Sequence, residues 1–229
     1  MANGTEYDCL LNLVKKRRST RQFLSNPVPN EYITKIVETA RWAPSAFHTQ
    51  PWEFMVVNDE ELKNKIVTVF ERLAPPIKDP AKGSLETKSF KDAPVYIFLL
   101  CDWRAKIGLP GQTSENIDRV TSLFNSSMAN AFLFMHLAAA SLGLASQWYT
   151  AGSRPEVENA LKEVVGIPEY FTIYDMMVIG YEAAPPNTKI VRDTDEMVHY
   201  NYCKSQEFRT DQEVVAYAEK TKAWCISEH

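Results

Sequence analysis

Residues 17–21 of the chain read Arg-Arg-Ser-Thr-Arg, and residues 43–52 read Ala-Pro-Ser-Ala-Phe-His-Thr-Gln-Pro-Trp. The first stretch places three guanidinium groups and two hydroxyls within five residues. Guanidinium groups donate forked hydrogen bonds that match a phosphate, and each charge-assisted bond contributes on the order of 1.5–3 kcal/mol. The run therefore indicates a phosphate site, although taken alone it is equally typical of a solvated helix end.

Apolar residues recur at helical spacing in several segments. Some of these segments begin with the pattern of a capping box, in which a side-chain oxygen is followed three residues later by Glu. The boxes are Asn58 with Glu61, Ser153 with Glu156, and Thr210 with Glu213. Gly166 and Pro168 are expected to end the helix that begins near Ser153. The predicted helices cover residues 7–17, 31–42, 62–73, 117–142, 157–165 and 211–224.

Short runs of aliphatic and aromatic residues, bounded by turn formers, predict strands over residues 53–57, 95–101, 145–149 and 173–181. Helices and strands alternate irregularly, which favours an α+β fold with a small, helix-covered sheet over a doubly wound parallel sheet. Residues 74–83 and 104–115 contain several Pro and Gly residues, so each is either a lid or a plain surface connection. No interdomain linker or internal repeat is visible, and we interpret residues 1–229 as one domain.

The formal net charge of −4 gives no field that would attract nucleic acid or an anionic membrane. Glu6 and Asp8 precede the basic run and no uninterrupted apolar core follows, so the N-terminus is unlike a secretory signal and we expect a cytoplasmic protein. Residues 128–145 are mostly apolar, but Asn130 and His136 interrupt them, which favours a buried helix over a membrane span. His136 is interpreted as a core residue whose hydrogen-bonding groups are satisfied. The four cysteines stand far apart and no metal site is predicted.

The C-terminal part of the chain is rich in aromatic residues between Arg192 and the predicted helix 211–224. That helix carries one mostly apolar stripe, which has to be buried. The tail either docks on its own subunit or reaches across to a partner and stabilises a homodimer.

The ordered set of motifs resembles the nitroreductase family of FMN-dependent flavoproteins. It begins with residues 17–21 and continues with Pro27-Val28-Pro29, a helix, Ala43-Pro44-Ser45, and Gln50-Pro51-Trp52 leading into a strand. Residues 143–148, 179–181 and 192–198 match later family segments. The resemblance spans nearly the whole chain and implies a nitroreductase-like fold with a small central antiparallel sheet. It also implies a homodimer in which residues from about 187 to 229 form an exchanged, dimer-embracing extension.

The resemblance implies FMN as the cofactor and assigns the basic run to it. Arg17, Arg18 and Ser19 are expected at the FMN phosphate and ribityl chain, and Arg21 at the pyrimidine edge of the flavin. Two-electron reduction leaves negative charge around the flavin N1 and C2 oxygen, and a fixed cation there stabilises the reduced form. Arg192 is expected to close on the phosphate.

The other cofactor-binding candidates surround the flavin ring. Pro44, Ser45 and Ala46 are expected to line the isoalloxazine from the other subunit, and His48 and Gln50 belong to the same motif. The segment Trp148, Tyr149 and Thr150 is expected to pass near the flavin N5 with a backbone amide.

The chain departs from the family pattern in places. Many members carry Asn where this chain has His48, so a hydrogen bond to the flavin or ribityl chain is made differently here or lost. Alternatively, His48 is a proton donor. A lone histidine in a loop is more often a structural hydrogen-bonding residue. Ile190 stands where a second basic residue often accompanies Arg192, which leaves Lys189 as a weaker phosphate candidate. Iodotyrosine deiodinases, a branch of this superfamily, share His-Thr before Pro-Trp, but residues 147–150 replace their Thr-rich segment near N5, which does not favour deiodination.

These features predict a homodimeric FMN-dependent oxidoreductase. It would take hydride from NADH or NADPH and reduce a small acceptor, such as a nitroaromatic, a quinone or an activated alkene, by a ping-pong mechanism. Two alternatives stay open: a flavin-consuming or reductively dehalogenating enzyme of the same superfamily, and a non-catalytic FMN-binding module.

Overall fold

The computed structural model describes residues 5–74, 78–79, 83–84, 90–151, 154–185, 189–202, 204 and 207–227. The chain forms two compact units, and each is described by itself. The first comprises Met1–Pro75 and Thr87–Pro185, and the second comprises Pro76–Glu86 and Pro186–His229. The single-domain organisation stays a prediction.

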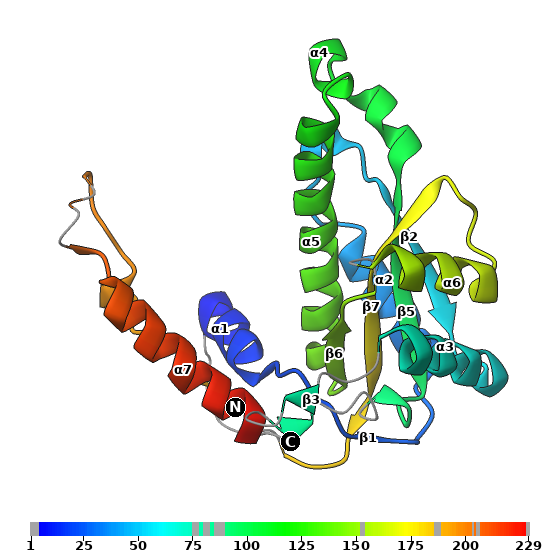
Figure 1. The fold of residues 1–229 in the computed structure, drawn as a ribbon, viewed down its shortest axis with the longest axis horizontal. Coiled ribbons are helices and arrows are strands. Elements are labelled where there is room, and N and C mark those ends of the chain that lie inside the picture. Colours follow the sequence, from blue (N-terminus) through cyan, green and yellow to red (C-terminus); the bar gives the residue numbers. More distant parts are fainter. Residues whose placement is uncertain are drawn as a thin grey trace. The chain divides into compact units, whose positions relative to one another are not determined.

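A five-stranded antiparallel sheet forms the centre of the first unit (Figure 1). Its strands are β1 (Phe23–Leu24), β2 (Trp52–Val57), β5 (Val95–Asp102), β6 (Ala145–Tyr149) and β7 (Phe171–Glu182). They lie in the order β1-β7-β5-β2, and β6 pairs with β7 as well. The α+β class and all the predicted strands are confirmed. The sequence missed β1, since two residues are too few to show a strand pattern.

Helices cover both faces of this sheet, as Figure 1 shows. Helices α2 (Asn30–Ala40) and α5 (Ile117–Ser141) lie on one face, and α3 (Glu60–Leu73) and α6 (Pro155–Val165) lie on the other. A further helix, α1 (Glu6–Lys16), buries none of its residues and packs against α5. Each matches a predicted helix. Gly166 adopts a positive φ of 73° and ends α6, as predicted.

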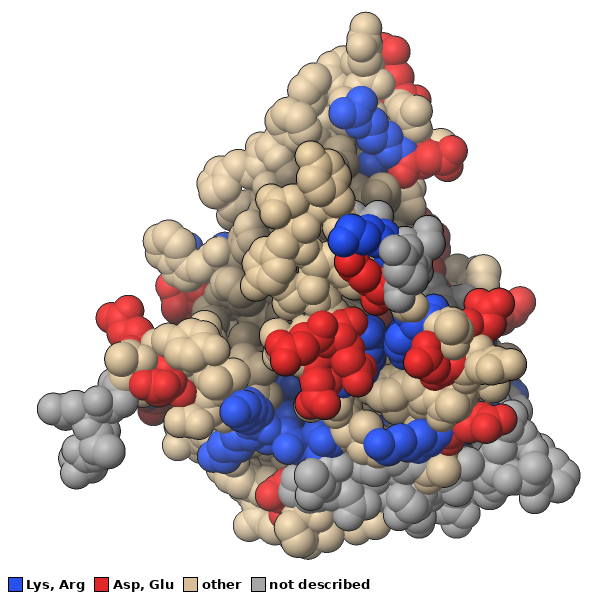
Figure 2. Space-filling view, turned by 90° about the vertical axis from the view of Figure 1, so that its left-hand side faces the viewer, with Lys and Arg blue, Asp and Glu red and all other residues tan. Residues whose placement is uncertain are grey.

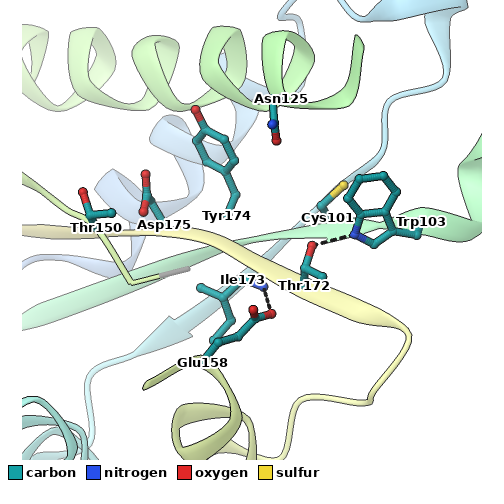
Figure 3. A pocket seen from close by; sticks show the side chains of 9 residues that line it. All are labelled: Cys101, Trp103, Asn125, Thr150, Glu158, Thr172, Ile173, Tyr174 and Asp175. Carbon is teal, nitrogen blue, oxygen red and sulfur yellow. Dashed lines mark hydrogen bonds between the residues drawn. The ribbon is translucent and has the colours of Figure 1, made fainter. Parts of the chain in front are cut away.

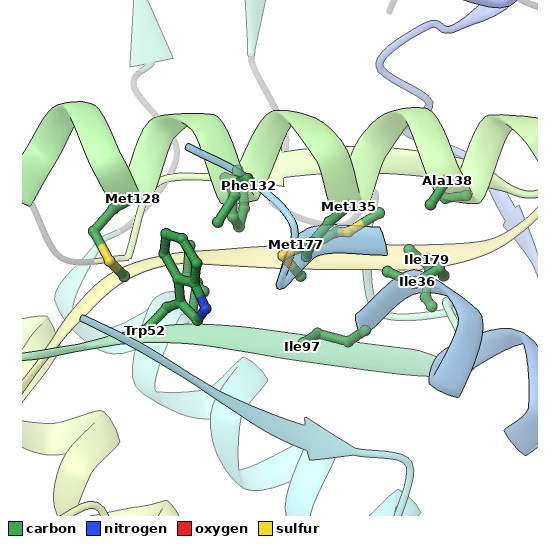
Figure 4. Close-up of a cluster of buried hydrophobic side chains, with 14 of the residues drawn as sticks. Ile36, Trp52, Ile97, Met128, Phe132, Met135, Ala138, Met177 and Ile179 are labelled. Carbon is green, nitrogen blue, oxygen red and sulfur yellow. The ribbon is translucent and has the colours of Figure 1, made fainter. Parts of the chain in front are cut away.

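The alternation of side chains along β5 separates two hydrophobic cores. Val95, Ile97 and Leu99 face α2 and α5, whereas Tyr96 and Phe98 face α3 and α6. Figure 4 shows the first core, in which side chains of α5 pack over the sheet. The apolar segment within residues 128–145 is therefore accounted for by burial in this core.

Two of the predicted helix caps need correction. The cap of α3 is Asp59, whose carboxylate accepts a hydrogen bond from the Leu62 amide at 2.8 Å, so the predicted Asn58 cap is wrong by one residue. A negative charge at this position also interacts favourably with the helix N-terminus. Helix α6 begins at Pro155 with Arg154 at its cap position, and Ser153 lies outside the described residues.

One of the two predicted loops is partly helical. The segment 104–115 contains most of a 3-10 helix, η3 (Trp103–Gly108), and a short helix, α4 (Gly111–Ser114). The carboxylate of Asp102 caps η3 at the Arg104 amide, which explains why a Gly- and Pro-containing stretch is ordered. Most of the other loop, 74–83, lies outside the described residues.

In the second unit the described elements are the pair β3 (Lys78–Asp79) and β4 (Gly83–Ser84), the turn η4 (Thr194–Glu196) and helix α7 (Asp211–Ser227). The predicted capping box of α7 is confirmed, because Thr210 and Glu213 exchange hydrogen bonds. Exchange of this segment in a dimer stays a prediction.

Acidic and basic side chains are interspersed on the molecular face shown in Figure 2, and neither sign covers it continuously. In the described residues, no helix combines the length and apolarity that a membrane crossing requires.

Candidate functional site

The basic run lies along strand β6. Helix α1 ends at Lys16, and the chain then extends so that the Thr20 amide donates to the Ser146 carbonyl at 2.9 Å. Ser19 and Ser146 form an isolated parallel bridge. Because β6 belongs to the central sheet, this contact fixes the predicted phosphate-binding run at the edge of a rigid element.

The two leading arginines of the run have different surroundings. Arg18 donates from Nη1 to the carbonyls of Lys15 and Arg17, at the C-terminal end of α1. Arg17 is half-buried, and within the described residues its guanidinium has no hydrogen-bond or ion-pair partner. Burial, and then the charge of Arg18, lower the pKa of Arg17. A half-buried cation without a counterion is suited to an anionic ligand, so Arg17 fits the predicted phosphate.

The second motif forms a strained loop against α5. Phe47, His48 and Gln50 have φ angles of 50°, 57° and 44°, which non-glycine residues rarely adopt. Such strain costs on the order of 1–3 kcal/mol per residue and clusters at functional sites. Helix α5 holds the loop, because the Ser127 hydroxyl accepts from the Ala46 amide at 3.0 Å and the Asn130 amide donates to the Pro44 carbonyl at 3.2 Å.

Polar groups within the loop bond to one another. The Ser45 hydroxyl accepts from the Gln50 amide at 3.1 Å, and the side chains of His48 and Gln50 meet at 2.9 Å between their Nε2 atoms. The His48 side chain is exposed. These contacts give His48 a structural partner, while its proton-donor role stays untested.

The end of β6 directs its side chains to opposite faces of the sheet. Trp148 stacks on His136 with ring centroids 5.9 Å apart, on the α5 face. Tyr149 packs between Phe70 and Phe90 in the opposite core, where burial raises its pKa to about 12. Only the backbone of Tyr149 is therefore placed to serve a ligand, whereas Thr150 is exposed beyond the strand.

A pocket of about 470 Å³ opens beside Thr150. It is formed where β7 continues past the last residue paired with β6, and Figure 3 shows its side chains coming from β5, β7, α5 and α6. The lining residues are Cys101, Trp103, Asn125, Thr150, Glu158, Thr172, Ile173, Tyr174 and Asp175. The basic run and this pocket thus lie toward opposite ends of β6.

Sequence reasoning missed most of this pocket, because its residues come from segments distant in the sequence. Asp175 carried a usable signal. It is the one carboxylate inside the apolar run 173–181, and a buried charge in such a run requires a partner or a role.

His136 only partly matches its predicted role. It is buried, and its Nδ1 lies 2.7 Å from the Ser146 hydroxyl, but its Nε2 has no hydrogen-bond partner in the described structure. Burial, and then the charge of Arg17, lower its pKa to about 3. His136 is therefore a neutral core residue beneath the basic run.

Two predicted phosphate ligands, Lys189 and Arg192, belong to the second unit. Arg192 donates to the Glu196 carbonyl at 2.8 Å and lies 3.4 Å from its carboxylate. Their roles stay predictions. No group of three or more metal-ligating side chains occurs among the residues that the structure describes.

A family model for nitroreductases matches residues 14–181, a span that contains the basic run, the strained loop and all of β6. The chain belongs to the nitroreductase family. Among family relatives, a protein of Methanothermobacter thermautotrophicus provisionally named NADH dehydrogenase/NAD(P)H nitroreductase is 28% identical over 82% of this chain and 85% of its own length.

Other relatives carry different names. An iodotyrosine deiodinase of Thermotoga neapolitana is 28% identical over 84% of this chain and 97% of its own length. The crystal structure of a protein provisionally named NADH oxidase, from Clostridium acetobutylicum, has a TM-score of 0.65 and 27% identity and covers 83% of this chain and 99% of its own. The predicted nitroreductase fold is confirmed.

Proposed function

We propose that this nitroreductase-family protein is an FMN-dependent oxidoreductase that takes hydride from NADH or NADPH and reduces a small organic acceptor in a second, separate step. Nitroaromatics, quinones and activated alkenes are the proposed acceptors. The proposal rests above all on the half-buried Arg17 beside β6, whose guanidinium has no partner among the residues that the structure describes.

The geometry of β6 supports this proposal. From Ser146, beside the basic run, to Thr150, beside the pocket, the chain advances by roughly 13 Å at the usual rise of a strand. A cofactor lying along this strand would have its phosphate at Arg17 to Ser19 and its ring at the pocket, with Arg21 at its pyrimidine edge. The names of the Methanothermobacter and Clostridium relatives favour a nicotinamide donor.

When bound, FMN supplies hydride transfer at its N5 atom. The chain's own residues would bind and orient it: Arg17 would neutralise the phosphate, Arg21 would stabilise negative charge on the reduced ring, and the backbone near Thr150 would serve the N5 side. The strained loop 43–52 is proposed to cover the ring of the partner subunit. If donor and acceptor use the same open face of the flavin in turn, the oxidised nicotinamide has to leave before the acceptor binds, which would give ping-pong kinetics.

The test is flavin loading followed by anaerobic reduction. Purified protein should carry or take up FMN with a yellow absorbance that bleaches when NADH or NADPH is added and returns when a quinone is added. A colourless protein that does not take up FMN contradicts the proposal. A bound flavin that stays yellow with both nicotinamides indicates the non-catalytic binding module.

Reductive dehalogenation is a second candidate. It is favoured by the deiodinase name of the Thermotoga relative, because the match covers 97% of the length of that relative. In that reaction a carbon–iodine bond is replaced by a carbon–hydrogen bond, and two electrons and one proton are consumed as iodide leaves. The FMN-loaded, reduced protein should then release iodide from an iodophenol faster than free reduced FMN does. An equal rate excludes this candidate and leaves the first proposal intact.

A further inference from the structure

Asp175 is a buried carboxylate that accepts hydrogen bonds from Trp148 at the end of β6 and from Ala151 just beyond it. The residue is 7% exposed, and its side chain projects from β7 into the pocket of Figure 3. Its Oδ2 accepts from the Trp148 indole N–H at 2.5 Å, and its Oδ1 accepts from the Ala151 amide at 3.0 Å. Thr150 lies between these two donors in the sequence.

Two N–H donors converge on this carboxylate, an arrangement that suits the ionised, acceptor-only form. Hydrogen bonds to an ionised acceptor are shorter and stronger than neutral ones. Asp175 therefore restrains the Trp148 side chain and the Ala151 amide, on either side of Thr150. The segment 148–151 cannot shift unless the buried carboxylate loses a hydrogen-bond partner. The neighbouring Tyr174 reports this charge, since its pKa is raised first by burial and then by Asp175.

We infer that Asp175 is a positioning residue: it fixes the segment 148–151 against the flavin edge, and its negative charge holds the flavin reduction potential down. The inference rests on the proposed function, which places the segment 148–151 near the flavin N5. A fixed anion near the ring opposes the addition of electrons, which is the reverse of the effect expected of Arg21 at the pyrimidine edge. The two residues together would set how readily the flavin accepts hydride.

The positioning role is tested first in FMN-free protein by hydrogen exchange of the Ala151 amide. Asp175→Ala removes the acceptor and should speed this exchange at least tenfold. The matched control is Asp102→Ala, because Asp102 pairs with Arg104 at the surface and does not line the pocket. Unchanged exchange in Asp175→Ala contradicts the positioning role.

The charge is tested with a pair of FMN-loaded variants, Trp148→Phe and Trp148→Phe/Asp175→Asn. Both lack the indole donor, and the Asn carbonyl can still accept from Ala151, so the pair differs mainly in one negative charge. Equilibration with a reference dye should show the double variant at least tenfold easier to reduce, which is about 30 mV for a two-electron couple. Asp102→Asn should leave the potential at the wild-type value.

Equal potentials within the pair overturn the inference. If the double variant does not fold, Trp148→Phe/Asp175→Ser repeats the comparison with a smaller acceptor. Failure of the proposed function is seen separately, in the wild-type protein, as absence of FMN uptake or of reduction by nicotinamide. A wild-type protein that loads and is reduced, combined with equal potentials in the pair, rejects this inference alone.

Discussion

At the scale of single residues, Arg17 and Arg21 are only four positions apart, but we expect them to have different roles. Arg17 is half-buried without a partner in the described part of the chain, as a phosphate ligand should be. Arg21 follows the contact of Thr20 with β6 and is assigned to the ring. Binding and reduction should therefore separate on mutation.

Arg17→Ala should weaken FMN binding about 10- to 100-fold, because a charge-assisted hydrogen bond contributes about 1.5–3 kcal/mol. Arg21→Ala should bind FMN more nearly normally but be reduced more slowly and at a lower potential. Fluorescence titration of FMN and stopped-flow reduction by NADH separate the two effects. Similar losses of binding and reduction in both variants would contradict the division of roles.

His136 should make the stability of the protein depend on pH. Its folded-state pKa is about 3, below its ordinary value of 6.5, so between these values the unfolded chain binds more protons. The free energy of unfolding should be independent of this group above about pH 6.5 and fall below it, by up to about 1.4 kcal/mol per pH unit.

Urea denaturation at several pH values between about 7 and 5 measures this slope, and His136→Gln provides the background from all other groups. The wild-type slope should exceed that of the variant, whatever stability the variant has lost overall. Parallel slopes would show that His136 is not kept neutral by folding.

At the scale of elements, β7 organises the first unit because it pairs with β1, β5 and β6. Gly180 lies where these pairings meet. A Cβ at Gly180 would be 2.6 Å from Cδ of Pro94 and 3.2 Å from Cδ1 of Phe23. The proline ring cannot move aside easily, so this position needs a residue without a side chain.

Gly180→Ala should destabilise the protein by about 1–3 kcal/mol, the usual cost of overpacking. Gly111→Ala is the matched control, because no atom lies within 4 Å of a Cβ built there. Thermal unfolding of both variants should show a lower midpoint for Gly180→Ala only. Equal midpoints would mean that Pro94 and Phe23 can move enough to accommodate a methyl group at position 180.

Elements were predictable where a pattern repeats over many residues. The apolar residues of α5 and the continuous aliphatic and aromatic run of β5 predicted the bounds of both elements to within a residue. Errors arose where the signal is a single side chain or a very short segment. Asn58 and Asp59 are both good cap residues, and only the folded backbone selects Asp59. Strand β1 depends on its pairing with β7, which local sequence does not encode.

At the scale of the whole molecule, the family motifs predicted that the basic run and the residues near Thr150 share one cofactor, and this stays a prediction. The structure shows that the basic run contacts β6 and that Thr150 directly follows this strand. The pocket was not predictable, since its walls meet only when β5, β7, α5 and α6 pack. Trp42 and Phe47 are 71% and 59% exposed. The proposed dimer would cover them.

A chain truncated after Asn187 tests the proposed dimer. It lacks Arg192 and the whole of α7, so it should associate more weakly, lose FMN, or both. Light scattering on a sizing column gives the mass, and flavin absorbance gives the loading. A fully loaded dimer of the truncated chain would reject tail exchange.

The positive φ angles of Phe47, His48 and Gln50 restrict which amino acids this loop accepts. Asn, Asp, His and Gly tolerate positive φ far better than β-branched residues do. The replacement of the family's common Asn by His48 is thus conservative for the backbone, whatever it does to the flavin. In a saturation library selected for folded protein, positions 47, 48 and 50 should retain Gly and Asn and discard Val and Ile. Retention of Val and Ile at these positions would show that the backbone there does not need a positive φ.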